Sequence, residues 1–110
     1  MPVVSVAVPT HPQIGTILTE VADAVADALG LGVGDVITVH TPTSASVTNG
    51  ETQVEAPAAW HIITIQGSDR GSEPMRRALA AAEASVREWC RSCGIRCEGV
   101  WTQWLMSGSR

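Results

Sequence analysis

Hydrophobic residues in the first forty positions follow a strand pattern, then a helix pattern, then a strand pattern again. Residues 3–8 are a continuous, mostly β-branched run, which is typical of a buried strand. Over residues 13–29, apolar side chains recur at the i, i+3, i+4 and i+7 spacing of an amphipathic helix. Gly30 ends that helix, and residues 36–40 resume a strand pattern. This order predicts a β-α-β unit over residues 1–40.

The same order of elements returns in the second half of the chain. Residues 60–65 read as a strand, residues 73–93 as a helix and residues 100–105 as a last strand, so a second β-α-β unit occupies 60–106. The two halves align without a gap at an offset of 59 from the first strand into the helix, and His11 then falls on Arg70. The chain is therefore built as two copies of one unit.

Turn and cap residues mark where each helix is expected to begin and end. Thr10 is the expected N-cap of the first helix and Ser72 of the second, and Gly94 is the expected residue after the second helix. Short strand–helix–strand connections cross over right-handed, which makes the two strands of each unit parallel. We therefore expect an α+β fold, with a four-stranded mixed sheet and both helices on one face.

A sheet with two apolar faces and helices for only one of them must bury the second face elsewhere. Residues 3–8 are apolar on both faces of the strand, so subunit association is the simplest way to cover the face without helices. Residues 1–110 form a single domain in this interpretation, with residues 41–59 as a connecting loop rich in Thr, Ser, Ala and Pro. Residues 46–54 could form a small hairpin, because the Asn49-Gly50 pair favours a type I′ turn.

Composition narrows the classes of function. The chain has 110 residues and a net charge of −4, so a nucleic-acid partner is not expected. Lysine and tyrosine are absent, which excludes Schiff-base lysine chemistry, a P-loop lysine and a tyrosine general acid. The apolar runs are far shorter than the roughly 20 residues of a membrane span. With no signal peptide visible, we expect a cytoplasmic protein without a membrane partner.

Pro2 is the most informative candidate for catalysis. Removal of Met1 would leave a secondary amine at the start of a buried strand, where a rigid sheet end holds it. Apolar walls or a nearby guanidinium disfavour the ammonium form of such an amine, which makes it a base near neutral pH. If Met1 is retained, Pro2 is an amide and has no basic nitrogen.

These features together resemble the tautomerase superfamily. The likeness covers nearly the whole chain, since Met1-Pro2 precedes an apolar strand and two β-α-β units follow. Residues 38–42, Thr-Val-His-Thr-Pro, are similar to the second strand of its macrophage migration inhibitory factor branch. Residues 67–73, Gly-Ser-Asp-Arg-Gly-Ser-Glu, are similar to the third-strand turn of its malonate semialdehyde decarboxylase and cis-3-chloroacrylic acid dehalogenase branches.

The resemblance implies a homotrimer with the amino-terminal proline in an apolar pocket near a subunit interface. It also implies that Arg70 binds the carboxylate of a small substrate, because a guanidinium grips a carboxylate in a bidentate manner. The other reading makes Arg70 a solvated turn residue paired with Asp69 or Glu73. A neighbouring cation such as Arg70 would also lower the pKa of the Pro2 amine.

The implied function is that of a tautomerase or isomerase that needs no cofactor and moves a proton on a small 2-oxo acid or enol. A decarboxylase, hydratase or dehalogenase of a small three-carbon acid is the alternative on the same scaffold. Because the chain has no tyrosine and no alignable glutamate to activate water, proton shuttling is favoured over hydration. A non-catalytic trimeric binding protein is the alternative from a different class.

Four further residues are candidates for substrate binding. The 4-oxalocrotonate tautomerase branch carries an arginine after its first strand, where this chain has His11, which is either a substrate contact or a surface residue at the helix start. His40 ends a strand and either faces the pocket or is a satisfied sheet residue. Arg76 either points into the site or lies on a solvated face. Trp101 and Trp104 are three residues apart on a strand, so they point to opposite faces of the sheet, and Trp104 could line the pocket.

The cysteines allow two readings. Cys90, Cys93 and Cys97 have the spacing C-x2-C-x3-C, and C-x-x-C is an element of zinc sites. Two of them lie on the apolar stripe of the second helix, where free cysteine behaves as a small hydrophobe. We therefore expect reduced thiols and no metal, with His61 as a structural residue.

Overall fold

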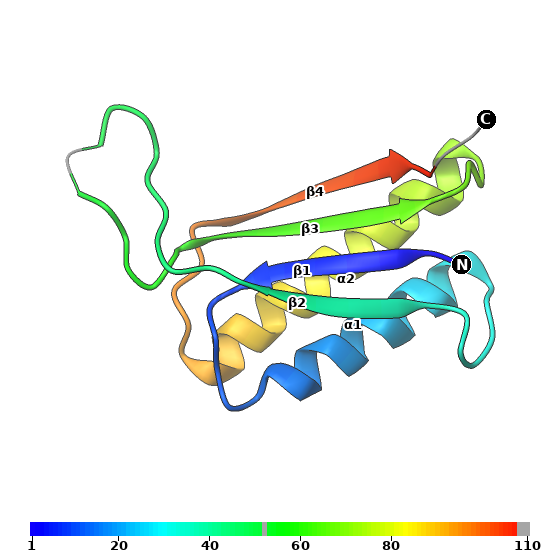
Figure 1. Ribbon diagram of the computed structural model, residues 1–110, viewed down its shortest axis with the longest axis horizontal. Helices are drawn as coiled ribbons and strands as arrows, with labels where there is room; N and C mark the ends of the chain where they lie inside the picture. The colour runs from blue at the N-terminus through cyan, green and yellow to red at the C-terminus, as the bar shows by residue number, and fades with distance from the viewer. Residues whose placement is uncertain (52, 108–110) are drawn as a thin grey trace.

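The chain folds into two β-α-β units in the predicted order. The computed structural model describes residues 1–51 and 53–107. The elements, in chain order, are β1 (Val3–Val8), α1 (Ile14–Leu29), β2 (Ile37–Pro42), β3 (Trp60–Gly67), α2 (Ser72–Cys93) and β4 (Gly99–Met106). Both helices lie on the same face of one sheet (Figure 1). The predicted α+β architecture is confirmed.

Strand pairing decides which residues meet at each end of the sheet. The strand order is β2-β1-β3-β4, with β1 and β2 parallel, β3 and β4 parallel, and β1 and β3 antiparallel at the centre. Val3 pairs with Gln66, so the start of β1 lies beside the carboxyl end of β3. In Figure 1 the N-terminus accordingly lies at the arrowhead end of β3 and β4.

The core lies between the sheet and the two helices. Alternate residues of the central strands point toward the helices and are fully buried, so the helices cover one of the two apolar faces predicted for residues 3–8. The indole N–H of Trp89 on α2 donates to the Gln13 carbonyl at 3.1 Å and ties the end of α2 to the start of α1. The buried core residues are Val4, Val6, Val8, Ile17, Val21, Val25, Ile63, Ile65, Ala78, Ala82, Val86, Trp89, Cys90 and Val100.

The opposite face of the sheet has no helix over it and is rich in large apolar side chains. We call this surface the open sheet face, and its exposed apolar residues are Val3, Ile37, Val39, Trp60, Ile62, Trp101 and Leu105. Trp101 is 60% exposed there, whereas Trp104 packs against the core, so the expected opposite facing of the two indoles is confirmed. The face stays uncovered because residues 1–51 and 53–107 form only two helices for one sheet.

The helix bounds agree with the predicted ones to within one residue, but the predicted N-caps are wrong. Gly30 and Gly94 follow the helices with φ of 70° and 68°, the left-handed conformation that glycine adopts without strain. α1 starts after Gln13 rather than Thr10, and Gly71 takes the position expected for Ser72. Neither helix start has a side-chain cap. In α2 the predicted cap residue, Ser72, is itself the first helical residue.

The loop between the two units folds back on itself through an antiparallel bridge, Ser46 to Glu55. Ser46 and Glu55 exchange two backbone hydrogen bonds of 2.9 and 2.8 Å there. The predicted type I′ turn is wrong, because such a turn needs positive φ at both central residues and only Gly50, at 90°, has it. Within the described residues, no helix has the length and apolarity needed to cross a bilayer.

Candidate functional site

Pro2 lies buried at the start of β1. Its side chain is among the fully buried ones, whereas Met1 before it is 70% exposed. The Pro2 carbonyl accepts a hydrogen bond of 3.1 Å from the Ile37 N–H, which fixes the residue to the start of β2 as well. The nitrogen of residue 2 is therefore held at a rigid sheet end.

Gly67 allows Pro2 and Trp104 to approach each other. A Cβ atom on Gly67 would stand 3.7 Å from the Pro2 Cα and Cβ atoms and 3.2 Å from Cζ2 of Trp104. The latter distance is tighter than ordinary van der Waals contact, so a side chain at this position would press on the indole. The absence of a side chain at Gly67 thus lets the indole pack against the same backbone as the proline ring.

Two polar groups at this end of the sheet are buried without a partner. They are Nε of Arg70 and Nε1 of Trp104, and neither has a hydrogen-bond acceptor within residues 1–51 and 53–107. Both are N–H donors, so both can receive an anionic oxygen. Because a buried donor without an acceptor destabilises the folded chain, its retention points to an acceptor supplied from outside.

Arg70 differs from its neighbouring arginines in its charge partners. Glu73 pairs with Arg76 and, at 3.6 Å, with Arg77, and Asp69 accepts a hydrogen bond of 2.9 Å from the Gly71 N–H. The two carboxylates that could have neutralised Arg70 are therefore engaged elsewhere. Across the part of the chain that the structure describes, Arg70 is in no ion pair. Its guanidinium is available to a carboxylate ligand.

Arg76 does not share this environment. Its side chain is 74% exposed and is paired with Glu73 one turn earlier on α2. An exposed i,i+3 ion pair of this kind contributes little to stability and leaves the side chain in solvent. Within one chain the structure places Arg76 on the solvated face of the helix.

His11 and His40 lie at the other end of the sheet. Nδ1 of His11 accepts a hydrogen bond of 3.0 Å from the Gln13 N–H, and its ring packs edge-on against Trp89 with 5.6 Å between centroids. Nε2 of His40 lies 3.0 Å from the Val8 carbonyl. The six residues of β1 span about 20 Å, so a single chain does not bring these histidines to Pro2.

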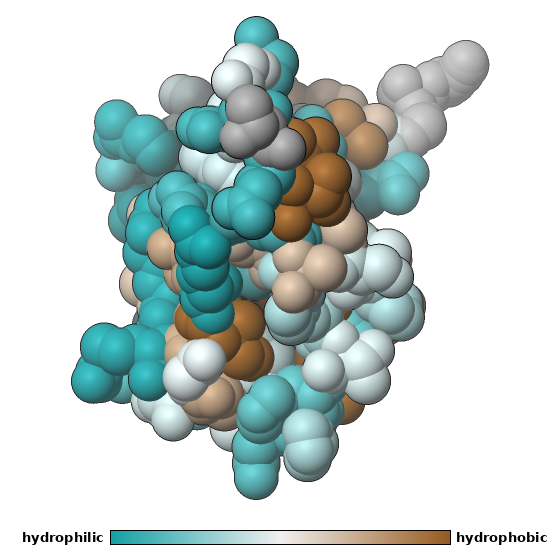
Figure 2. All heavy atoms as spheres, turned by 90° about the vertical axis from the view of Figure 1, so that its left-hand side faces the viewer, coloured by the Kyte–Doolittle hydropathy of each residue, from teal (hydrophilic) through white to brown (hydrophobic). Residues whose placement is uncertain are grey.

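Two cavities of the single chain also lie at that far end. One of about 490 Å³ is bounded by residues 9–11, 53–58 and 93–96 and includes His11. Another of about 260 Å³ lies between the hairpin, Trp60 and Arg96. Viewed from this end, the surface is largely hydrophilic with small hydrophobic patches between the polar side chains (Figure 2). Neither cavity contains Pro2, Arg70 or Trp104.

A third group of residues was not predicted as a unit. His61, Cys90 and Cys97 lie together between β3 and the end of α2. The C-x-x-C motif in the sequence instead joins Cys90 with Cys93, which lies outside this cluster. Burial lowers the pKa of His61, although its hydrogen bond with the Arg96 carbonyl acts in the opposite direction. The spacing of the cysteines gave a signal for this cluster, but nothing in the sequence linked His61 to it.

Comparison with solved structures gives close likeness in fold at low sequence identity. A fused 4-OT protein, solved as a symmetric trimer, is 19% identical over 93% of this chain and 82% of its own, with a TM-score of 0.71. Malonate semialdehyde decarboxylase is 18% identical, with 96% and 84% covered and a TM-score of 0.65. Pt0534 is 17% identical, with 96% and 83% covered and the same TM-score of 0.65.

Comparison of the sequence alone identifies no relative among family models or curated proteins. The likeness therefore lies in the arrangement of the elements, which agrees with these structures over almost the entire chain. The resemblance noted in the sequence is confirmed in the fold, and the chain has the fold of the tautomerase superfamily.

Proposed function

We propose that the chain is a tautomerase-type enzyme in which Pro2, after removal of Met1, shuttles a proton on a small 2-oxo acid or its enol. The observation that carries this proposal is the grouping of a buried Pro2 with two buried, unpartnered donors, on Arg70 and Trp104, at one end of the sheet. Proton transfer of this kind needs a base, a cationic group that binds the substrate carboxylate and an apolar surface that excludes water. It needs no cofactor.

Each residue has a separate part in the proposed reaction. The neutral amine of Pro2 takes the proton from the enol oxygen. The resulting ammonium returns a proton to the enol carbon that does not bear the oxygen, so the keto acid forms with no net change in protons. Arg70 holds the substrate carboxylate. The indole N–H of Trp104 faces the charge that develops on the enolate, and the ring excludes water.

The names of similar proteins support the choice of substrate class. Pt0534 was solved after inactivation by 2-oxo-3-pentynoate, which is a 2-oxo acid. The work on malonate semialdehyde decarboxylase includes a mutant whose first residue, a proline, is replaced by alanine, and it names decarboxylase and hydratase activities. A decarboxylase on this scaffold is therefore the second candidate. In it the amine would act in its charged form.

The pH profile separates the two candidates. If Pro2 is a base, kcat/KM for an enol such as phenylenolpyruvate should rise with pH as the amine loses its proton. Burial favours the neutral amine, so the rise should be complete near neutral pH. An acid would give the opposite slope. Stopped-flow absorbance measures the rate, and a profile that falls as pH rises contradicts the assignment of a base.

The proposed active form is a homotrimer. The open sheet face supports this, because a single chain leaves the large apolar residues of this surface in solvent. The fused 4-OT structure is named as a symmetric trimer. Packing of subunits over this face would also close the space around Pro2, and a chain could receive His11 or His40 at Pro2 only from another subunit.

Charge on the open sheet face should dissociate the trimer. Ile62 is 41% exposed on that face, and Ile62→Asp would place a carboxylate in the subunit contact, where its desolvation opposes association. Sedimentation velocity should show trimers for the wild type and monomers for the variant. Ala84→Asp, on the solvent side of α2, is the control and should stay trimeric. A monomeric wild type would rule out the proposed assembly.

A further inference from the structure

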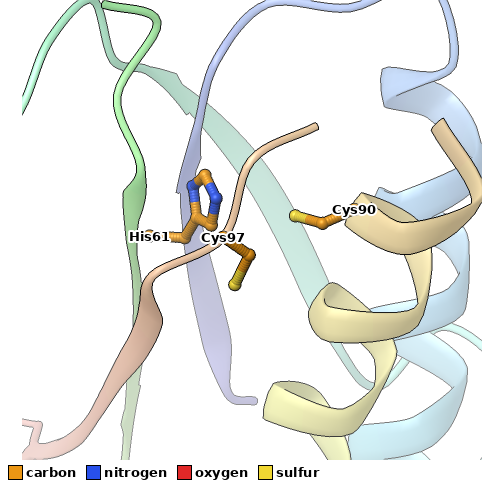
Figure 3. A group of neighbouring side chains, drawn as sticks. All are labelled: His61, Cys90 and Cys97. Carbon is orange, nitrogen blue, oxygen red and sulfur yellow. The ribbon is translucent and has the colours of Figure 1, made fainter. Parts of the chain in front are cut away.

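Three potential metal ligands meet inside the chain. They are His61 at the start of β3, Cys90 near the end of α2 and Cys97 in the connection to β4. A ring nitrogen of His61 and the Sγ atoms of the two cysteines all lie within 4.8 Å of one another. Figure 3 shows the Cys90 side chain reaching from the helix toward the other two.

His61 has the form of a metal-ligating imidazole. The residue is fully buried, and its Nε2 lies 3.0 Å from the Arg96 carbonyl oxygen. Because a carbonyl only accepts, Nε2 carries the proton and Nδ1 carries the free lone pair. Nδ1 is buried, and no donor from the described chain reaches it. Metal-ligating histidines in proteins have this same arrangement, with the second nitrogen donating to a carbonyl.

The two thiols suit a divalent ion. Both are free thiols, Cys90 buried and Cys97 partly buried, and a thiolate sulfur is a ligand that zinc prefers. Binding of one divalent ion would form two metal–sulfur bonds and release two protons. Two thiolates, one neutral imidazole and one divalent ion have no net charge, which is the state that a buried site can hold.

We propose that His61, Cys90 and Cys97 bind one thiophilic divalent cation of the zinc class. Zinc bonds of about 2.0–2.3 Å imply ligand separations of about 3.3–3.8 Å, which small side-chain rotations can supply. The fourth position falls to water, because Cys97 is only partly buried. The site is separate from Pro2, since His61 lies at the opposite end of β3.

Zinc and cobalt titrations of the full chain test this proposal. Reduced, metal-free protein should bind one Zn²⁺ per chain, measured by competition with a chromophoric chelator. Co²⁺ should give thiolate-to-metal charge-transfer absorption, which only sulfur ligands produce. Bound Zn²⁺ should also raise the melting temperature. These readouts do not depend on catalysis by Pro2.

Two cysteine variants localise the site. Cys97→Ala should weaken Zn²⁺ binding by at least about tenfold, and Cys97→Ser gives the same comparison if the alanine variant is unstable. Cys93→Ala is the control, because Cys93 is half-buried on the same helix and lies outside the cluster. It should bind Zn²⁺ as the wild type does, and both variants should match the wild-type circular dichroism.

Three results would overturn the proposal. They are absence of Zn²⁺ uptake by the reduced wild type, a Co²⁺ complex without charge-transfer absorption, and equal loss of affinity in the Cys93 and Cys97 variants. A Cys90–Cys97 disulfide in the isolated protein, with no metal uptake after its reduction, would likewise assign the cysteine pair to redox chemistry instead.

Discussion

Replacing Pro2 with alanine is expected to lower kcat/KM for phenylenolpyruvate by about 10²–10⁴-fold, which is the contribution of a positioned general base. The ring of Pro2 is buried beside Gly67 and Trp104, and alanine has no ring to fill that space. The amine of the variant is therefore no longer held at the reacting atom. The rate of ketonisation, followed by absorbance at one pH, measures the loss.

The fold should survive this change. β1 keeps all its sheet pairings in the variant, and residue 2 contributes to them only through its carbonyl. Circular dichroism and sedimentation should therefore match the wild type. Pro12→Ala, an exposed proline outside the sheet, is the control and should retain full activity. Equal rates for Pro2→Ala and the wild type would remove Pro2 from the mechanism.

Replacing Arg70 with glutamine should lower kcat/KM by about 10- to 150-fold. A hydrogen bond to a charged group contributes about 1.5–3 kcal/mol, which converts to that range. Arg70→Lys should recover only part of the loss, because an ammonium cannot bind a carboxylate in a bidentate manner. Steady-state kinetics of the three proteins at one pH measure the effect.

An uncharged substrate isolates the part played by Arg70. The methyl ester of phenylenolpyruvate has no carboxylate, so its turnover should change little between the wild type and Arg70→Gln. Arg87→Ala is the control, since Arg87 is paired with Glu83 on the exposed side of α2. If acid and ester substrates lose activity equally in Arg70→Gln, Arg70 does not hold the carboxylate.

The layered fold could be predicted because its causes are local. The apolar run over residues 3–8 indicates a buried strand, and Gly30 and Gly94 mark helix ends through their conformation. The N-caps of the helices could not be predicted in the same way. Thr10 is a good cap by residue type, but the chain turns at Gln13 instead, where the Trp89 indole binds the Gln13 carbonyl.

The grouping at Pro2 could be anticipated only in part. The repeat aligns Arg70 with His11, but the central strands run antiparallel, so the two residues lie at opposite ends of the sheet. His61 occupies the position that corresponds to Pro2 in the second unit. Its meeting with Cys90 and Cys97 depends on how α2 packs on β3, and this long-range contact has no sequence signature.

The intact mass of the mature protein tests the central claim most directly, because only an uncapped Pro2 has a basic nitrogen. Met1 is 70% exposed and lies before β1, so its removal leaves the sheet pairings of β1 unchanged. We expect a chain lighter by one methionine, with proline as the first residue in amino-terminal sequencing. A mature protein that retains Met1, or carries an acyl group on Pro2, would contradict it.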